Sequence, residues 1–300
     1  MDYRQLGKSD LCVSSIGMGC VTFGREIDRD TSFQIMNHAF ERGITLFDTA
    51  EAYAAGASET VLGEWIAGRN VRDDIVLATK VSGTLTKDRI ITSVDRSLER
   101  LRTDRIDLFQ LHNWDESTSL EETLEAMNSL VDQGKIRYIG CSNYMAWQLA
   151  AALVLSAQRG LARIQSIQPP YNLVQREIEA DVLPLCADQE TGVISYSPLS
   201  AGFLTGKYRR GQKAPPGTRF DVIPAHQPIY FTDQGYAMLD RLDRAAEQSG
   251  RSIVQLALAW VLKQRHVTSV LIGARNTSQV DQVFEAAEAG IDDELAQKLT

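Results

Sequence analysis

An alternation of short apolar segments with longer amphipathic segments runs through this chain and constrains its fold more than any other feature. Apolar runs that stop at polar residues predict strands, and the segments between them carry the spacing and end signals of helices. Repeated strand–helix units predict a parallel sheet. The predicted strands are residues 14–17, 45–48, 74–80, 104–112, 136–142, 164–168, 193–197 and 267–272.

Eight such units in 300 residues favour a closed (β/α)8 TIM barrel over an open doubly wound sheet. No long interruption separates the units, so one domain is predicted over residues 1–300. Residues 2–13 predict a short N-terminal β-hairpin, and Asp30 and Ser58 are the expected N-caps of the first two helices. The interval 198–230 is rich in proline and lacks periodicity, which is typical of a lid or binding loop.

Charge and composition narrow the function classes. The net charge of −8 argues against a general nucleic-acid-binding surface. No stretch is apolar enough to span a bilayer, so no membrane partner is predicted, and the N-terminus has no signal core. Four scattered cysteines predict a reducing compartment, hence the cytoplasm, and no structural metal. Nothing in the pattern indicates an oligomeric state.

The glycines of residues 17–24 belong to neither of two well-known phosphate-binding motifs. Their spacing is not G-x-G-x-x-G, and no phosphate-binding lysine follows. A Rossmann fingerprint and a P-loop are both excluded on that ground. The glycines are expected to supply a tight turn, or to let the backbone approach a flat ligand.

Polar side chains stand where nearly every predicted strand ends. In a barrel these ends converge on one mouth, where active sites lie. Each residue alone has a structural explanation as a cap or a hydrogen-bonded side chain, but together they indicate a site. The residues at these ends are Asp48 with Tyr53, Lys80, His112, Ser142 with Asn143, Gln168, Tyr196 with Ser197, and Gly273 with Arg275.

Asp48, Tyr53, Lys80 and His112 suit the protonation of a carbonyl oxygen. A free tyrosine has a pKa of about 10, and a neighbouring ammonium is expected to lower it. An aspartate beside the lysine would keep it charged, and a histidine can donate a hydrogen bond to an oxygen that gains negative charge. No side chain can supply a hydride, so a cofactor must supply it.

The chain resembles the aldo-keto reductases over nearly its whole length. The family has a (β/α)8 barrel and uses NADPH, less often NADH. The stretches that carry the resemblance, in order, are 44–53 (ITLFDTAEAY), 78–80 (ATK), 107–112 (DLFQLH), 140–143 (GCSN), 168–173 (QPPYNL), 196–199 (YSPL) and 202–208 (GFLTGKY).

The resemblance implies a role for each matching residue. Tyr53 would be the general acid, tuned by Asp48 and Lys80, and His112 would orient and polarise a carbonyl of an aldehyde, ketone or sugar-like substrate. Phe23 and Trp114 would line the substrate pocket, with Phe220 or Tyr230 as further candidates. The implied contacts to the cofactor are Ser142, Asn143 and Gln168 at the nicotinamide carboxamide, Tyr196 on its ring, Ser197, Leu199, Gly202, Leu204 and Lys207 along the pyrophosphate, and Gly273, Arg275, Gln279 and Gln282 at the adenosine end. Because a guanidinium suits a 2′-phosphate, Arg275 favours NADPH.

The chain departs from the family pattern at two places, and two alternative functions stay open. Ala54 stands where many family members have glycine, and Gln282 and Val283 replace an acid–amide pair near the adenine. The β subunits of voltage-gated potassium channels, which bind NADPH and act largely as channel partners, share the pattern 53–56 but lack histidine at the position of His112. The alternative function is therefore an NADP(H)-binding redox-sensing or channel-associated module. A metal-dependent barrel hydrolase is disfavoured, because Asp48, Asp107 and His112 have no convincing ligand spacing.

Overall fold

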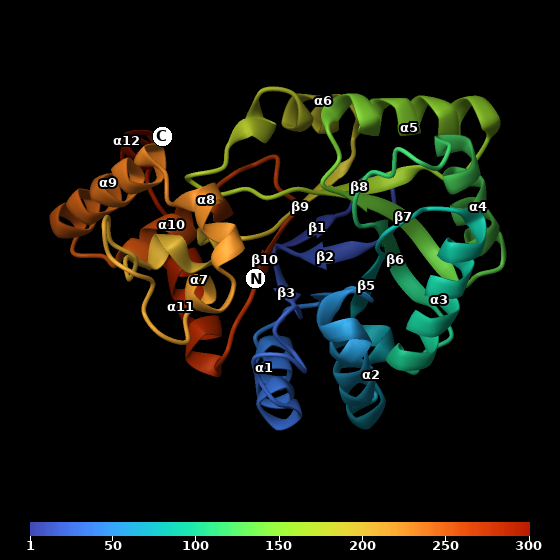
Figure 1. Ribbon diagram of the computed structural model, residues 1–300, viewed down its shortest axis with the longest axis horizontal. Helices are drawn as coiled ribbons and strands as arrows, with labels where there is room; N and C mark the ends of the chain where they lie inside the picture. Colours follow the sequence, from blue (N-terminus) through green and yellow to red (C-terminus); the bar gives the residue numbers. More distant parts are fainter. The chain divides into compact units, whose positions relative to one another are not determined.

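The computed structural model describes residues 1–300, which divide into two compact units (Figure 1). The barrel unit comprises Met1–Pro169, Ile178–Ser195 and His266–Val280. The second unit comprises Pro170–Glu177, Tyr196–Arg265 and Asp281–Thr300. The single domain expected over residues 1–300 stays a prediction.

In the barrel unit, eight parallel strands close into a barrel in the order β10-β3-β4-β5-β6-β7-β8-β9. Closure is made by Val270, which pairs with Ile16 on one side and Ser195 on the other. The predicted (β/α)8 TIM barrel is confirmed, and no strand bound differs from the predicted one by more than two residues. The strands are β3 (Ile16–Gly19), β4 (Leu46–Asp48), β5 (Val76–Val81), β6 (Ile106–Leu111), β7 (Ile136–Ser142), β8 (Ile164–Gln168), β9 (Gly192–Ser195) and β10 (Ser269–Ile272).

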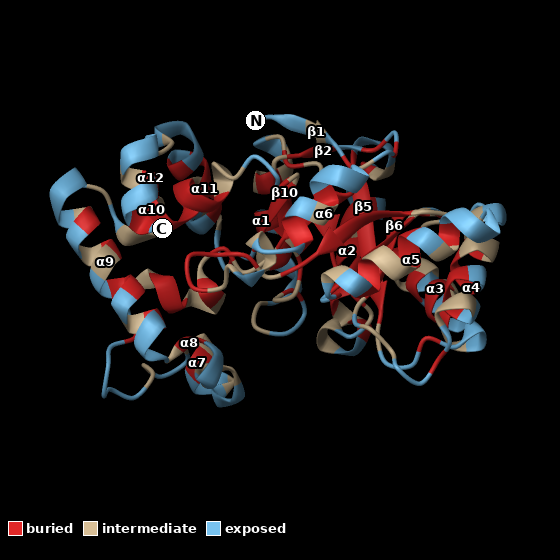
Figure 2. Ribbon diagram, turned by 90° about the horizontal axis from the view of Figure 1, so that it is seen from above, coloured by how far each residue is buried: buried red, intermediate tan, exposed pale blue.

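The strands β5 and β6 are buried along their whole length, while the helices around the barrel expose one face to water (Figure 2). Strands covered on both faces are mostly apolar, and four of the six residues in each of β5 and β6 are apolar. In α3, Ile90, Val94 and Leu101 recur at helical spacing and are buried. The helices of this unit are α1 (Arg29–Glu41), α2 (Ala57–Arg69), α3 (Lys87–Leu101), α4 (Leu120–Asp132), α5 (Ala146–Arg159) and α6 (Val182–Gln189), with η2 (Arg72–Asp74) between α2 and β5.

Two helix starts differ from the expected ones. Asp28, not Asp30, caps α1, because its carboxylate accepts a hydrogen bond from the backbone N–H of Thr31. Gly56 precedes α2, so Ser58 lies inside the helix; its hydroxyl donates to the carbonyl oxygen of Cys20 at 2.7 Å. Side chains that can cap a helix are common near its start, and only the local backbone decides which of them does so.

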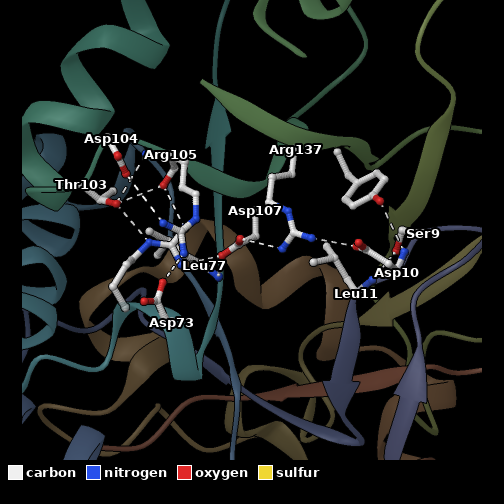
Figure 3. A network of polar contacts seen from close by, with 12 residues as sticks. Ser9, Asp10, Leu11, Asp73, Leu77, Thr103, Asp104, Arg105, Asp107 and Arg137 are labelled. Atoms are coloured by element: carbon white, nitrogen blue, oxygen red, sulfur yellow. Dashed lines mark hydrogen bonds and ion pairs between the residues drawn. The ribbon is translucent and has the colours of Figure 1, made fainter. Parts of the chain in front are cut away.

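The predicted N-terminal hairpin is confirmed as β1 (Tyr3–Gln5) paired antiparallel with β2 (Cys12–Ser14). Its turn lies close to β8: Gly7 has φ +61°, and a Cβ there would lie 2.3 Å from the carbonyl oxygen of Gln165. Asp10 of the same turn accepts a hydrogen bond from Arg137, which also contacts Asp107 near the beginning of β6 (Figure 3). The hairpin is thereby joined to the end of the barrel where the strands begin.

The second unit is helical. Its elements are η4 (Ser200–Thr205), α7 (Arg219–Val222), η5 (Pro224–His226), α8 (Gln227–Tyr230), α9 (Asp233–Ser249), α10 (Ile253–Leu262) and α12 (Asp293–Leu299); η3 (Glu177–Glu179) and α11 (Thr277–Ala289) each contain residues of both units. The interval 198–230, expected to be a lid or binding loop, therefore contains short helices. They pack through aromatic rings: Tyr208 and Phe220 are both buried, with centroids 4.8 Å apart.

None of these helices combines the length and the apolar character needed to cross a membrane. The cytoplasmic location inferred from the cysteine content stays a prediction.

Candidate active site

A buried ion pair lies at the mouth of the barrel. Asp48 ends β4, and Lys80 lies near the end of the neighbouring strand β5. The ammonium of Lys80 is fully buried; it contacts Asp48 Oδ1 and donates to the carbonyl oxygen of Thr49 at 2.8 Å. An ammonium without water is stable only when it is paired and hydrogen-bonded, and both conditions are met here.

Two further groups complete the cluster. Tyr53 begins the 3₁₀ turn η1 (Tyr53–Gly56) after β4, and its hydroxyl lies 3.4 Å from Lys80 Nζ. His112 directly follows β6, and its ring meets that of Tyr53 edge-on, with centroids 5.8 Å apart. All four side chains predicted to carry the chemistry are therefore close together, and all belong to the barrel unit.

The second carboxylate oxygen of Asp48 is held by two amides. Gln110 and Gln168 each donate from Nε2 to Asp48 Oδ2 at 2.9 Å. Gln168 was predicted as a cofactor contact, whereas Gln110 was missed. Its signal was a buried amide inside the apolar run of β6, two residues before His112 and so on the same face of the strand.

Burial controls the proton affinities of the cluster. Desolvation raises the pKa of Tyr53, and the opposing charge of Lys80 does not cancel it. Lys80 acts to lower this pKa, as expected, but desolvation outweighs it and the net shift is upward. Burial acts to lower the pKa of Lys80, but Asp48 and Tyr53 outweigh it and the pKa is raised. Desolvation and the nearby Lys80 charge lower the pKa of His112 to about 4. At neutral pH the cluster thus holds a neutral phenol, an ammonium and a neutral imidazole.

Three predicted nicotinamide contacts lie together beside this cluster. Ser142 Oγ and the backbone N–H of Asn143 both donate to the carbonyl oxygen of Gln168, at 2.7 and 3.2 Å. Asn143 has φ +57°, and its amide donates to the carbonyl oxygen of His112 at 3.0 Å. A hydroxyl with two amides offers donors and acceptors, which fits a ligand that carries a carboxamide.

The residues predicted to contact the adenosine belong to different units. Gly273, Arg275 and Gln279 are exposed in the barrel unit, where Gln279 Oε1 accepts a hydrogen bond from the backbone N–H of Arg275 at 2.8 Å. Gln282 is exposed and belongs to the second unit. Their contacts with a cofactor stay predictions.

The predicted pyrophosphate segment lies in the second unit and is tightly turned. Ser197, Ser200, Ala201 and Gly202 all have positive φ. Asn172 pins the turn: its amide nitrogen donates to the carbonyl oxygen of Ser197 at 3.0 Å, and its oxygen accepts from Ser200 Oγ at 2.8 Å. The other predicted contacts of this segment are Tyr196, Leu199, Leu204 and Lys207, and their part in holding a cofactor stays a prediction.

The two predicted pocket residues differ in exposure. Phe23 is fully buried, whereas Trp114 is half-buried and meets Tyr144 and Trp147 edge-on at 5.2 and 5.6 Å. Phe220 and Tyr230 are both buried within the second unit. Of the four aromatic side chains, Trp114 has the most surface to offer a substrate. No group of three or more His, Cys, Asp and Glu side chains is arranged as a metal site, so the disfavoured hydrolase has no ligand cluster.

Comparison with known proteins gives matches over nearly the whole chain. The sequence model of the "Aldo/keto reductase family" matches residues 15–300. The Bacillus subtilis protein named aldo-keto reductase YhdN is 35% identical, over 95% of this chain and 88% of its own length. Norsolorinic acid reductase B of Aspergillus parasiticus is 34% identical, over 97% of this chain and 81% of its own. A probable voltage-gated potassium channel subunit beta of Arabidopsis thaliana is 33% identical, over 96% and 92%.

Proposed function

Since the chain belongs to the aldo/keto reductase family and is a carbonyl-reducing oxidoreductase on that ground, we propose that it uses NADPH and that Tyr53 is its proton donor. The substrates are aldehydes, ketones or sugar-like carbonyls, which become alcohols. One observation carries the proposal: a neutral phenol lies 3.4 Å from a fully buried ammonium and edge-on to a neutral imidazole. This arrangement supports proton donation to a carbonyl oxygen.

Each side chain of the cluster has its own role in the proposed carbonyl reduction. When bound, the nicotinamide supplies a hydride to the carbonyl carbon. Tyr53 gives its hydroxyl proton to the carbonyl oxygen, which closes the alcohol O–H bond and leaves a phenolate. Lys80 stabilises that phenolate by its charge, and a proton from solvent restores the phenol. Asp48 keeps Lys80 charged, and His112 donates a hydrogen bond to the carbonyl oxygen and orients it.

The donor set of the barrel unit supports a nicotinamide ligand. Ser142, Asn143 and Gln168 place a hydroxyl and two amides beside the catalytic cluster, and a carboxamide needs both kinds of partner. The guanidinium of Arg275 favours NADPH over NADH, because it can pair with a 2′-phosphate.

The test measures NADPH oxidation with a panel of aldehydes and ketones, in the full-length protein and in Tyr53→Phe. Turnover is expected in the parent, and the variant is expected to lose about 10²- to 10⁴-fold in kcat, the usual contribution of a general acid. Cofactor binding, followed by fluorescence, should survive the substitution. Equal turnover in the two proteins would refute the proton-donor assignment. Comparing NADPH with NADH in Arg275→Met tests the cofactor preference separately.

The channel-associated alternative has one specific support, the similarity to a protein named as a probable channel β subunit. His112 supports the enzyme instead, because a module that only binds the cofactor has no use for a group that polarises a carbonyl. Tight NADPH binding without turnover of any carbonyl in the panel would favour the alternative.

A further inference from the structure

One ring nitrogen of His112 has a partner outside the four-residue cluster. Ser82 Oγ lies 2.8 Å from His112 Nδ1. The two residues follow neighbouring strands: Ser82 comes directly after β5, and His112 directly after β6, where its backbone N–H donates to the carbonyl oxygen of Val81 at 3.0 Å. Because Nδ1 is occupied by this contact, Nε2 is the ring nitrogen left to meet a substrate.

The backbone of Ser82 is clamped on both sides. Its N–H donates to Glu51 Oε1 at 2.8 Å, and its carbonyl oxygen accepts from Arg89 Nη2 at 3.1 Å. Glu51 and Arg89 pair with each other, and Ser93 Oγ donates to Glu51 Oε2 at 2.7 Å. A clamp made from a loop and a helix fixes where the Ser82 hydroxyl lies.

The imidazole is neutral at pH 7, because burial and Lys80 hold the pKa of His112 at about 4. A neutral imidazole carries one proton, and a hydrogen bond to one nitrogen decides which nitrogen carries it. A serine hydroxyl can donate or accept, so the contact with Ser82 is compatible with either tautomer.

We propose that Ser82 is a positioning residue that donates its hydroxyl proton to His112 Nδ1 and thereby keeps the imidazole proton on Nε2. The choice of donor rests on the proposed function, because a carbonyl oxygen has only lone pairs to offer. An Nε2–H can donate to that oxygen, whereas a bare Nε2 would repel it. The clamp of Glu51 and Arg89 keeps the hydroxyl within reach of Nδ1.

The tautomer is measured directly by ¹⁵N NMR of the full-length protein at pH 7, labelled at its four histidines. The His112 signals are identified by their absence in His112→Gln. In the parent we expect the pyridine-type shift for Nδ1 and the pyrrole-type shift for Nε2. A protonated Nδ1 in the parent would overturn the proposal, whatever the enzyme does.

Three substitutions of Ser82 extend the test. Ser82→Thr keeps the hydroxyl and should keep the parent's tautomer and kcat. Ser82→Ala removes the donor, so the Nδ1 shift should move and kcat should fall roughly fivefold, the effect of one hydrogen bond between neutral groups. Ser82→Asp offers only acceptors, so the imidazole proton should move to Nδ1 and kcat should fall further. An Asp variant with an unprotonated Nδ1 and the parent's kcat would contradict the proposal.

Ser129→Ala is the matched control, because Ser129 is similarly half-buried in the barrel unit but donates to the carbonyl oxygen of Ala126 instead. It should change neither the His112 signals nor kcat. The two proposals fail differently. If the parent reduces no carbonyl, the proposed function fails while the NMR still reports the tautomer. If the parent is active with the proton on Nδ1, only the inference about Ser82 fails.

Discussion

The barrel holds two buried aspartates at opposite ends, and they serve different purposes. Asp48 ends β4 at the mouth, and Asp107 is the second residue of β6, at the end where the strands begin. Asp107 accepts a hydrogen bond from the backbone N–H of Leu77 at 2.9 Å and lies 3.3 Å from Arg137 Nη1 (Figure 3). Arg72 Nη1 lies 2.8 Å away, an ion pair without the alignment of a hydrogen bond.

The charged partners of the two aspartates explain why Asp48 and Asp107 serve different purposes. The side chains of Arg72 and Arg137 are 15% and 39% exposed, so water shares their charge. Lys80 has no exposed surface, and it contacts a phenol as well as Asp48. A buried ion pair by itself therefore does not identify an active site. The feature that distinguishes the active site is a third group beside the pair, here Tyr53, that can release a proton.

The largest effect is expected from Asp48→Asn. The substitution leaves the Lys80 ammonium buried without a counter-charge, which should cost about 3–5 kcal/mol of unfolding free energy. Activity should fall at least about 100-fold, since without Asp48 the buried Lys80 is no longer held charged and in place to stabilise the phenolate. Urea unfolding and NADPH oxidation measure the two effects. Parent-like activity in a folded Asp48→Asn protein would remove Asp48 from the mechanism.

Asp107→Asn is the matching change at the other end. Because both arginines reach water, the expected loss of unfolding free energy is smaller, about 1–3 kcal/mol. Turnover with saturating aldehyde should stay at the parent's value below the unfolding temperature. A folded Asp107→Asn protein with strongly reduced kcat would break the distinction between the two ends.

The pH dependence sharpens the comparison further. A raised pKa keeps the proton on Tyr53, so the donor form persists above the usual value of about 10. Carbonyl reduction should therefore be flat between about pH 6 and about pH 9, while alcohol oxidation, which needs the phenolate, should rise with pH over that range. Asp107→Asn should leave both profiles in place. A reduction rate that falls with an apparent pKa near neutrality would show that Lys80 outweighs burial after all.

The smallest effect concerns backbone strain at the mouth. Ala54 and Ala55 have φ +50° and +51°, whereas Asn70 and Arg102, with φ +56° and +54°, are the C-caps of α2 and α3. Left-handed backbone costs alanine about 1–2 kcal/mol, and glycine loses part of that gain through its more flexible unfolded chain. Ala54→Gly should therefore stabilise the protein by about 0.5 kcal/mol in urea unfolding. Destabilisation would show that the Ala54 methyl group makes contacts that outweigh the strain.

The sequence predicted the barrel, the hairpin and the four side chains of the cluster, because strand alternation and strand ends are local signals. It missed Gln110 and Ser82. Whether an amide inside an apolar run faces the barrel interior depends on register with neighbouring strands, and the contact between Ser82 and His112 joins two loops 30 residues apart. The net pKa shift of Tyr53 was also not predicted from the sequence, because desolvation depends on which groups cover the side chain.

The second unit was the least predictable part. Its short helices are held by rings of Phe203, Tyr208, Phe220 and Tyr230, whose irregular spacing matches no helical or strand period. The cofactor contacts stay predictions from the resemblance, since a ligand's partners are set by its own shape as well as by the chain.

The pairing of β3 with β10 has a consequence for how the protein is made. Ile16 pairs with Val270, so the seam of the barrel joins residues from nearly opposite ends of the sequence. A ribosome must release the chain through β10 before this pair can form. Until then β3 and β9 present unpaired edges, which are surfaces on which nascent chains aggregate. Such long-range contacts also make folding slow. We therefore expect newly synthesised molecules to be most prone to aggregation in the interval just before β10 emerges.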